Sequence, residues 1–151
     1  MSSRKIDAVA ALVRWRSFGQ TLAERAHRRA SAECTEARTK ADAARSNVDA
    51  VTHHLRDMLS APILDLAKLQ CVAQMQEHAL AVSASRDLEL AEASDKRQAA
   101  MSMHLEARTK TRIVESRHER IAAAAADRSE KRDFDRMAEL RRQPTLEPSH
   151  D

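Results

Sequence analysis

The sequence has few of the residues that end helices. It contains one glycine and three prolines among 151 residues, and two of those prolines, Pro144 and Pro148, lie close to the C-terminus. Glycine and proline are the least favourable residues in the interior of a helix. Their scarcity, together with abundant alanine, arginine, glutamate and leucine, predicts an all-α protein made of long helices.

Bulky apolar residues are also scarce. There is no tyrosine, one tryptophan and two phenylalanines, and aromatic residues make up 2% of the chain. Much of the hydrophobic fraction of 42% is alanine, and burying each carbon of a side chain stabilises a fold by only about 0.8 kcal/mol. We therefore expect a thin helical structure with no deep core. Since it would offer no pocket where several groups converge, we expect that the protein is not an enzyme.

Other absences narrow the class of protein. We expect neither a membrane span nor a secretory signal, because no run of about 18 apolar residues occurs and Arg14 and Arg16 interrupt the first apolar segment. This favours a cytoplasmic location. The two cysteines, Cys34 and Cys71, are spaced for neither a metal nor a redox motif, and the histidines are not spaced as metal ligands. We therefore expect no metal and no other cofactor.

A single interior proline, Pro62, predicts one break in the helical pattern. Ser60 can cap a new helix and proline is tolerated in a first helical turn. The expected elements are a first helix at about 3–58, a turn at about 59–62 and a second helix at about 63–142. A disordered tail is expected at 143–151, because it contains the two remaining prolines.

Each predicted helix carries a row of mostly apolar residues at alternating steps of three and four, which we call its seam. The first seam is Ile6, Val9, Val13, Arg16, Gln20, Ala23, His27, Ala30, Cys34, Ala37, Ala41, Ala44, Val48, Val51, Leu55 and Met58. The second, less apolar seam is Val72, Met75, Ala79, Val82, Arg86, Glu89, Ala93, Lys96, Ala100, Met103, Ala107, Lys110, Val114, Arg117, Ile121 and Ala124. Sustained heptad spacing of this kind is typical of a coiled coil.

The two seams can face each other in an antiparallel coiled-coil hairpin. Layers such as Val48 with Val72 and Val13 with Ala107 have residue numbers that add up to about 120, which places the turn near Pro62. In this register the second helix overhangs the first by about 26 residues, or roughly 40 Å at 1.5 Å per residue.

Two groups of residues lie away from the predicted seams and are candidate partner-binding sites. Trp15, Phe18 and Leu22 form a stripe nearly opposite the first seam, and exposed aromatic surface usually marks a partner site. A third helical segment covering the stripe is the alternative. In the C-terminal helix, Phe134 and Met137 form a second apolar stripe. It also includes Leu140, and it is accompanied by the basic residues Arg128, Lys131, Arg132 and Arg136. Its alternative is that these residues fold back on the N-terminal helix.

The C-terminal segment "RHERIAAAAADRSEKRDFDRMAELRRQP" contains a basic pair, Lys131 and Arg132, followed by Asp133, Phe134 and the small residue Ala138. With a chain of about 150 residues and a predicted hairpin, it resembles the central stalk proteins of bacterial type III secretion, the FliJ, YscO and HrpO group. The missing tyrosine and the alanine-rich seam resemble the injectisome branch, which serves virulence, more than the flagellar one.

This resemblance implies a non-enzymatic stalk that places both termini in the pore of a hexameric secretion ATPase and points its hairpin end towards the export gate protein. It implies a location at the cytoplasmic side of the inner-membrane base of the apparatus, with only peripheral contact to the membrane. The alternative is a coiled-coil chaperone or escort for secretion subunits or substrates, which uses the stripe at Trp15. Binding to other chaperones and self-association remain open. The interleaved charges, with a formal net charge of +3, are typical of a solvated helix surface, so no nucleic-acid partner is expected.

Overall fold

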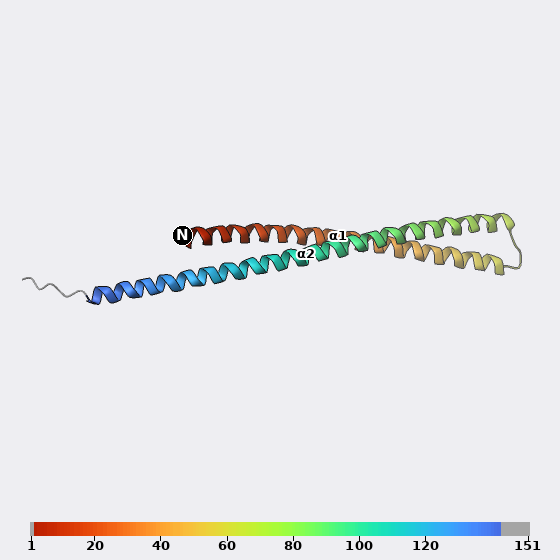
Figure 1. The fold of residues 1–151 in the computed structure, drawn as a ribbon. Coiled ribbons are helices and arrows are strands. Elements are labelled where there is room, and N and C mark those ends of the chain that lie inside the picture. The colour runs from red at the N-terminus through yellow and green to blue at the C-terminus, as the bar shows by residue number, and fades with distance from the viewer. Residues whose placement is uncertain (1, 143–151) are drawn as a thin grey trace, which may run out of the picture. The chain divides into compact units, whose positions relative to one another are not determined.

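The computed structural model describes residues 2–142, which form two long helices and no strand (Figure 1). Helix α1 (Ser2–Ser60) has 59 residues and helix α2 (Leu66–Arg142) has 77. The predicted all-α class is confirmed. The predicted tail at 143–151 lies outside the described residues.

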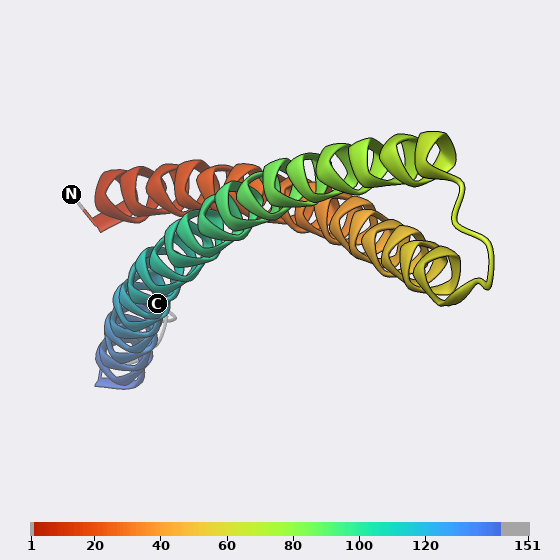
Figure 2. The same cartoon turned by 90° about the vertical axis from the view of Figure 1, so that its right-hand side faces the viewer.

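Contacts within the chain divide it into a central part, Thr21–Glu106, and a terminal part that combines Met1–Gln20 with Ala107–Asp151. In the central part, α1 and α2 run antiparallel on either side of the connection at 61–65, as Figures 1 and 2 show. The Arg45 guanidinium lies 2.7 Å from the Asp87 carboxylate, and the Gln76 amide donates a hydrogen bond of 3.0 Å to the Thr52 hydroxyl. In the terminal part, the Thr111 hydroxyl donates to the backbone carbonyl of Arg16 at 3.2 Å.

The connection between the helices differs from the predicted turn. Helix α1 continues to Ser60. It ends there because the next residue, Ala61, precedes Pro62, and a residue before proline disfavours the helical conformation. The Ser60 hydroxyl donates back to the carbonyl of Arg56 at 2.8 Å and so does not cap α2. The N-cap is Asp65, whose carboxylate accepts hydrogen bonds from the backbone amides of residues 67 and 68 at 3.1 and 3.2 Å. Helix α2 therefore begins after Asp65 rather than at Pro62.

The predicted seam of α1 is confirmed residue by residue. All sixteen of its members are buried or half-buried, including the polar Arg16, Gln20 and His27. The seam is narrow. Few other residues of α1 are half-buried, and Cys34 and Ala41 are the only buried residues in the part of α1 that the structure describes. Steps of three and four were a sufficient guide for this helix because apolar residues occupy most of the row.

The predicted seam of α2 is half right. Every second member, from Val72 to Ile121, is buried or half-buried, but the other eight members are exposed, and the residue after each of seven of them is half-buried or buried instead. These seven replacements are Gln76, Ser83, Leu90, His104, Thr111, His118 and Ala125. The sequence pattern favoured Met75 and Met103, which are 54% and 66% exposed. Hydrophobicity was misleading because polar residues occupy the interface and bond across it.

The predicted pairing register is also wrong. The cross-helix pairs Arg45–Asp87 and Thr52–Gln76 in the central part, and Arg16–Thr111 in the terminal part, have residue numbers that add up to between 127 and 132. The prediction for Val48 with Val72 required about 120. The shift is about one heptad. The register differs because the connection between the helices is longer than predicted and because the buried row of α2 is displaced by one residue at most of its alternate positions.

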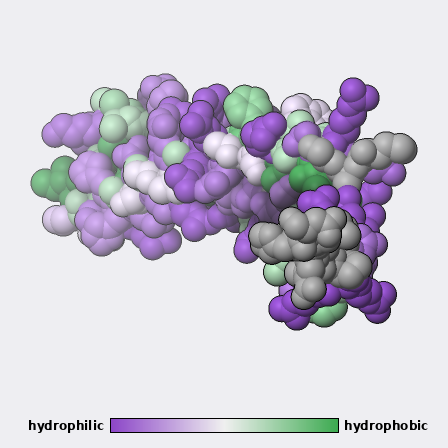
Figure 3. All heavy atoms as spheres, turned by 90° about the vertical axis from the view of Figure 1, so that its left-hand side faces the viewer, coloured by the Kyte–Doolittle hydropathy of each residue, from purple (hydrophilic) through white to green (hydrophobic). Residues whose placement is uncertain are grey.

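Little of the chain is buried. Among the described residues only Cys34, Ala41, Val72, Ala79 and Thr111 are buried, and no large side chain is fully enclosed. The chain exposes 12441 Å², whereas a folded monomer of this mass is expected to expose about 7700 Å². Hydrophilic residues dominate the face in Figure 3, with hydrophobic ones in scattered groups. The fold thus leaves most of its apolar side chains available to partners.

Candidate partner-binding surfaces

The last part of α2 is a helix without neighbours. From residue 126 to residue 142 every residue is exposed except Ala138, which is half-buried. Five alanines, Ala122–Ala126, precede this stretch, and alanine has the strongest helix propensity. Two arginines, Arg141 and Arg142, lie in the last turn, where positive charge interacts favourably with the helix dipole. We call residues 126–142 the C-terminal stretch.

The apolar stripe of the C-terminal stretch is an open surface. Phe134 is 75% exposed, and Met137 and Leu140 are each 59% exposed. Phe134 and Met137 line a hollow on the helix surface, and Phe134 also lines a second hollow. The first is bordered by Glu130, Asp133, Ala138, Arg141 and Arg142, and the second by Asp127, Glu130, Lys131 and Asp135. Phe134 is thus the apolar centre of a charged surface, while Leu140 lines neither hollow.

The basic residues of the stretch are partly held by the helix itself. The Nε atoms of Arg128 and Arg132 donate to the backbone carbonyls four residues earlier, at 2.9 and 3.1 Å. The Lys131 ammonium lies 3.2 Å from the Asp127 carboxylate, with both side chains mostly exposed. Arg136 is exposed as well. Such solvated contacts contribute about 0–1 kcal/mol each, so these cations can exchange their partners easily.

The stripe predicted on α1 is also exposed. Trp15 is 64%, Phe18 62% and Leu22 48% exposed. The guanidinium carbon of Arg16 lies 4.8 Å from the centroid of the Trp15 ring, a cation–π contact that helps to orient the indole. No described residue buries the three side chains, so the predicted partner surface is accessible.

Sequence reasoning missed a set of polar contacts inside the seam. The rings of His27 and His104 are stacked with centroids 6.1 Å apart and planes within 6°. Their Nδ1 atoms and the Nε atom of Arg16 are buried without a hydrogen-bond partner among the described residues. The available signal was the heptad spacing of Gln76, Ser83, His104 and Thr111, which hydrophobicity alone does not weigh.

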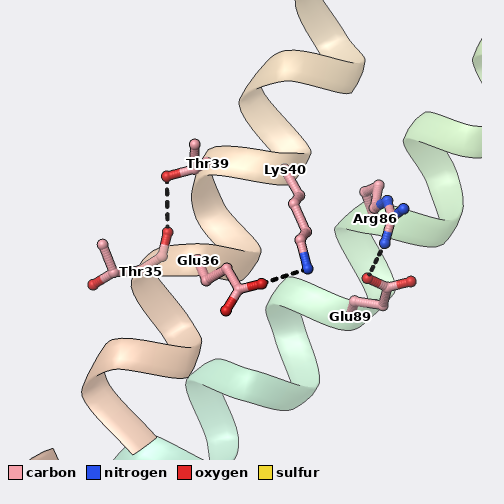
Figure 4. Close-up of polar contacts among 6 residues, drawn as sticks. All are labelled: Thr35, Glu36, Thr39, Lys40, Arg86 and Glu89. Carbon is pink, nitrogen blue, oxygen red and sulfur yellow. Dashed lines mark hydrogen bonds and ion pairs between the residues drawn. The ribbon is translucent and has the colours of Figure 1, made fainter. Parts of the chain in front are cut away.

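Polar contacts on the outer surfaces mostly join residues three or four apart within one helix (Figure 4). Lys40 lies 2.6 Å from Glu36, and Arg86 lies 2.7 Å from Glu89. The hydrogen bond and the positive charge of Lys40 lower the pKa of the Glu36 carboxyl below its ordinary value. These pairs stabilise the helices locally but define no site.

Residues 2–142 contain neither a candidate membrane span nor a candidate metal site. No helix there is apolar enough over a sufficient length to cross a bilayer. No group of three or more histidine, cysteine, aspartate or glutamate residues there is arranged to hold a metal ion.

Comparison of the whole chain with protein-family models, curated proteins and solved structures finds no match.

Proposed function

We propose that the protein is a non-enzymatic coupling stalk of a bacterial type III secretion system. In this role its C-terminal stretch enters the pore of the hexameric export ATPase, and the hairpin end reaches the export gate at the inner-membrane base. The observation that carries the proposal is the exposure of the C-terminal stretch, where a helix with an apolar stripe continues past the last seam residue of α2.

The difference in length between the two helices supports this proposal. Helix α2 has 77 residues against 59 in α1. In the terminal part, the contact between Arg16 and Thr111 sets a register in which the first residues of α1 lie opposite residue 125 or so of α2. Burial stops at the same place. The stretch beyond it is therefore free to enter a partner.

The chemistry of the C-terminal stretch suits a narrow, wet channel. The alanines at 122–126 keep the helix slim, and the charged residues remain solvated. Exposed ion pairs contribute about 0–1 kcal/mol each, so contacts with successive ring subunits would be weak and reversible. Phe134, with Met137 beside it, supplies an apolar contact.

The opposite end also carries unused apolar surface. Around the connection, Leu59, Ile63, Leu64 and Leu66 are between 46% and 86% exposed. Exposed apolar groups of this kind commonly mark an interaction site. They support a second contact at the hairpin end, where the stalk hypothesis puts the export gate.

One observation favours a second candidate function. The exposed stripe of Trp15, Phe18 and Leu22 is as open as the C-terminal stripe and fits a chaperone or escort that binds amphipathic helices of secretion subunits. An escort would bind several small partners stoichiometrically through this stripe, and loss of the C-terminal stretch would not affect that binding.

The test is a chain that ends at Ala126, expressed in the native cell. We expect its hairpin to stay folded, because only exposed helix is removed, while ATPase stimulation and export are lost. The double variant Phe134→Ala/Met137→Ala keeps every charge and isolates the apolar contact. Its matched control is Leu88→Ala/Met103→Ala, which removes two equally exposed apolar side chains elsewhere on α2. Normal export by the truncated chain would contradict the proposal.

A further inference from the structure

The outward side of the first third of α1 combines exposed apolar and positively charged residues. The positions of α1 that lie furthest from its seam recur at heptad spacing. We call those between residues 4 and 29 the outer face. It consists of Arg4, Asp7, Ala8, Ala11, Arg14, Trp15, Phe18, Thr21, Leu22, Arg25, Arg28 and Arg29. All twelve are exposed. The outer face therefore has five arginines, one carboxylate and the three apolar residues of the α1 stripe.

Most of these positive charges are free. Arg28 pairs with Glu24 on the same helix. Among the described residues, no ion pair involves Arg4, Arg14, Arg25 or Arg29. Unneutralised arginines on both sides of an apolar stripe attract an anionic partner that also has an apolar layer.

Other exposed apolar residues have more balanced charges around them. Leu88 lies between Asp87 and Glu89, which pair with Arg45 and Arg86, and Phe134 lies between Asp133 and Asp135. These sites would attract an anionic surface less than the outer face does. On the outer face of α1, exposed large apolar side chains lie beside several unpaired arginines.

We propose that the outer face of α1 docks on the surface of an anionic phospholipid membrane. Tryptophan is enriched at the membrane–water interface, and a helix with apolar residues beside arginines binds there in the plane of the surface. Trp15, Phe18 and Leu22 enter the boundary between headgroups and acyl chains, while the arginines contact lipid phosphates. A nucleic-acid phosphate backbone would match the arginines but offers no apolar layer for Leu22.

This inference goes beyond the proposed function and does not depend on it. The outer face contains no residue of the C-terminal stretch, so vesicle binding and ATPase coupling can fail separately.

The single tryptophan provides the assay. The whole protein is mixed with vesicles of phosphatidylcholine alone or of phosphatidylcholine with phosphatidylglycerol, and Trp15 fluorescence and co-sedimentation are recorded. We expect a shift of the emission to shorter wavelength and co-sedimentation with the anionic vesicles only. The shift should be lost as salt is raised, because screening weakens the arginine contacts.

Two variants separate the contributions. Arg14→Gln/Arg25→Gln/Arg29→Gln should weaken binding by about a hundredfold, at about fivefold for each arginine near an anionic surface. Phe18→Ala/Leu22→Ala should remove most of the fluorescence shift. The charge-matched control Arg38→Gln/Arg56→Gln/Lys68→Gln changes three exposed basic residues elsewhere and should bind within about threefold of the unmodified chain, because distant charges are screened.

Three results would overturn the proposal. The first is absence of binding to anionic vesicles, which would assign the stripe to a protein partner. The second is equal binding to neutral vesicles. The third is a control triple variant that loses as much affinity as the outer-face triple variant, since binding would then follow net charge rather than this face. Circular dichroism of each variant checks that helicity is retained.

Discussion

Helix α2 contains two regions of similar composition, one packed against α1 and the other exposed. From Val72 to residue 125, a buried or half-buried residue recurs nearly every three or four positions, whereas from residue 126 to 142 Ala138 alone is half-buried. Both regions are strong helix formers rich in charge. Helix propensity thus sets how far α2 extends, while contact with α1 decides which of its residues are structural. The residues that contact nothing are those available for function.

The largest expected difference between the two regions comes from placing a charge on each. Ala41 is fully buried on the α1 side of the paired region. Ala41→Glu should lower the free energy of unfolding by about 3 kcal/mol or more, since an unpaired charge would be buried there. Ala126→Glu at the start of the C-terminal stretch should change it by less than about 0.5 kcal/mol. Urea unfolding followed by circular dichroism measures both, and equal effects would remove the distinction between the regions.

The register of the paired region can be tested by cross-linking. In a background lacking both native cysteines, the pair Thr52→Cys/Gln76→Cys should be joined within one chain by a short bis-maleimide, because the native side chains are hydrogen-bonded. The pair Val48→Cys/Val72→Cys belongs to the register displaced by about one heptad and should react poorly. Preferential reaction of the second pair, or cross-links only between chains, would contradict the antiparallel contacts described here.

These contacts mark the limit of what the sequence could predict. The α1 seam was predictable because its apolar residues follow one row. The α2 seam was not, because Gln76, His104 and Thr111 replace the apolar Met75 and Met103 at the interface. A hydrophobicity pattern cannot detect a hydrogen bond to a backbone carbonyl such as that of Arg16. The start of the second helix was predicted wrongly for a similar reason, since the carboxylate of Asp65 rather than the hydroxyl of Ser60 caps the helix.

The two candidate surfaces also differ in how far the sequence could predict them. The α1 stripe could be predicted from spacing alone, because Trp15, Phe18 and Leu22 lie opposite a seam that was correctly assigned. The hollows around Phe134 could not, since they depend on how the long side chains of Glu130 and Arg141 lie along the helix. The stalk function stays a prediction that the exposed surfaces support.

A smaller effect is expected from a single polar contact in the paired region. Thr111 is buried and donates to the carbonyls of both Arg16 and Ala107, at 3.2 and 3.0 Å. Thr111→Val should lower stability by about 1 kcal/mol, a typical net value for one hydrogen bond. Thr39→Val is the matched control, because the exposed Thr39 hydroxyl donates only to Thr35 within its own helix. Indistinguishable unfolding midpoints for the two variants would show that the contact across the helices adds nothing.

The smallest expected effect lies on the solvated surface of α1. Lys40 lowers the pKa of the Glu36 carboxyl through a hydrogen bond and its charge. Because the folded-state pKa is the lower one, the pair stabilises the helix above the unfolded-state pKa, and this contribution is lost as pH falls through the folded-state value. Lys40→Ala should raise the Glu36 pKa towards its ordinary value in an NMR titration, with no measurable change in global stability. An unchanged Glu36 titration would show that the ion pair is not populated in solution.

The central claim is that the C-terminal stretch of α2 is a binding element for a hexameric ATPase. It is tested most directly by mixing the purified chain with the secretion ATPase of the same cell and measuring the mass of the complex by light scattering. The account predicts one chain per hexamer for the full-length protein and no complex for a chain that ends at Ala126. Equal binding of the two chains, or six copies per hexamer, would contradict it.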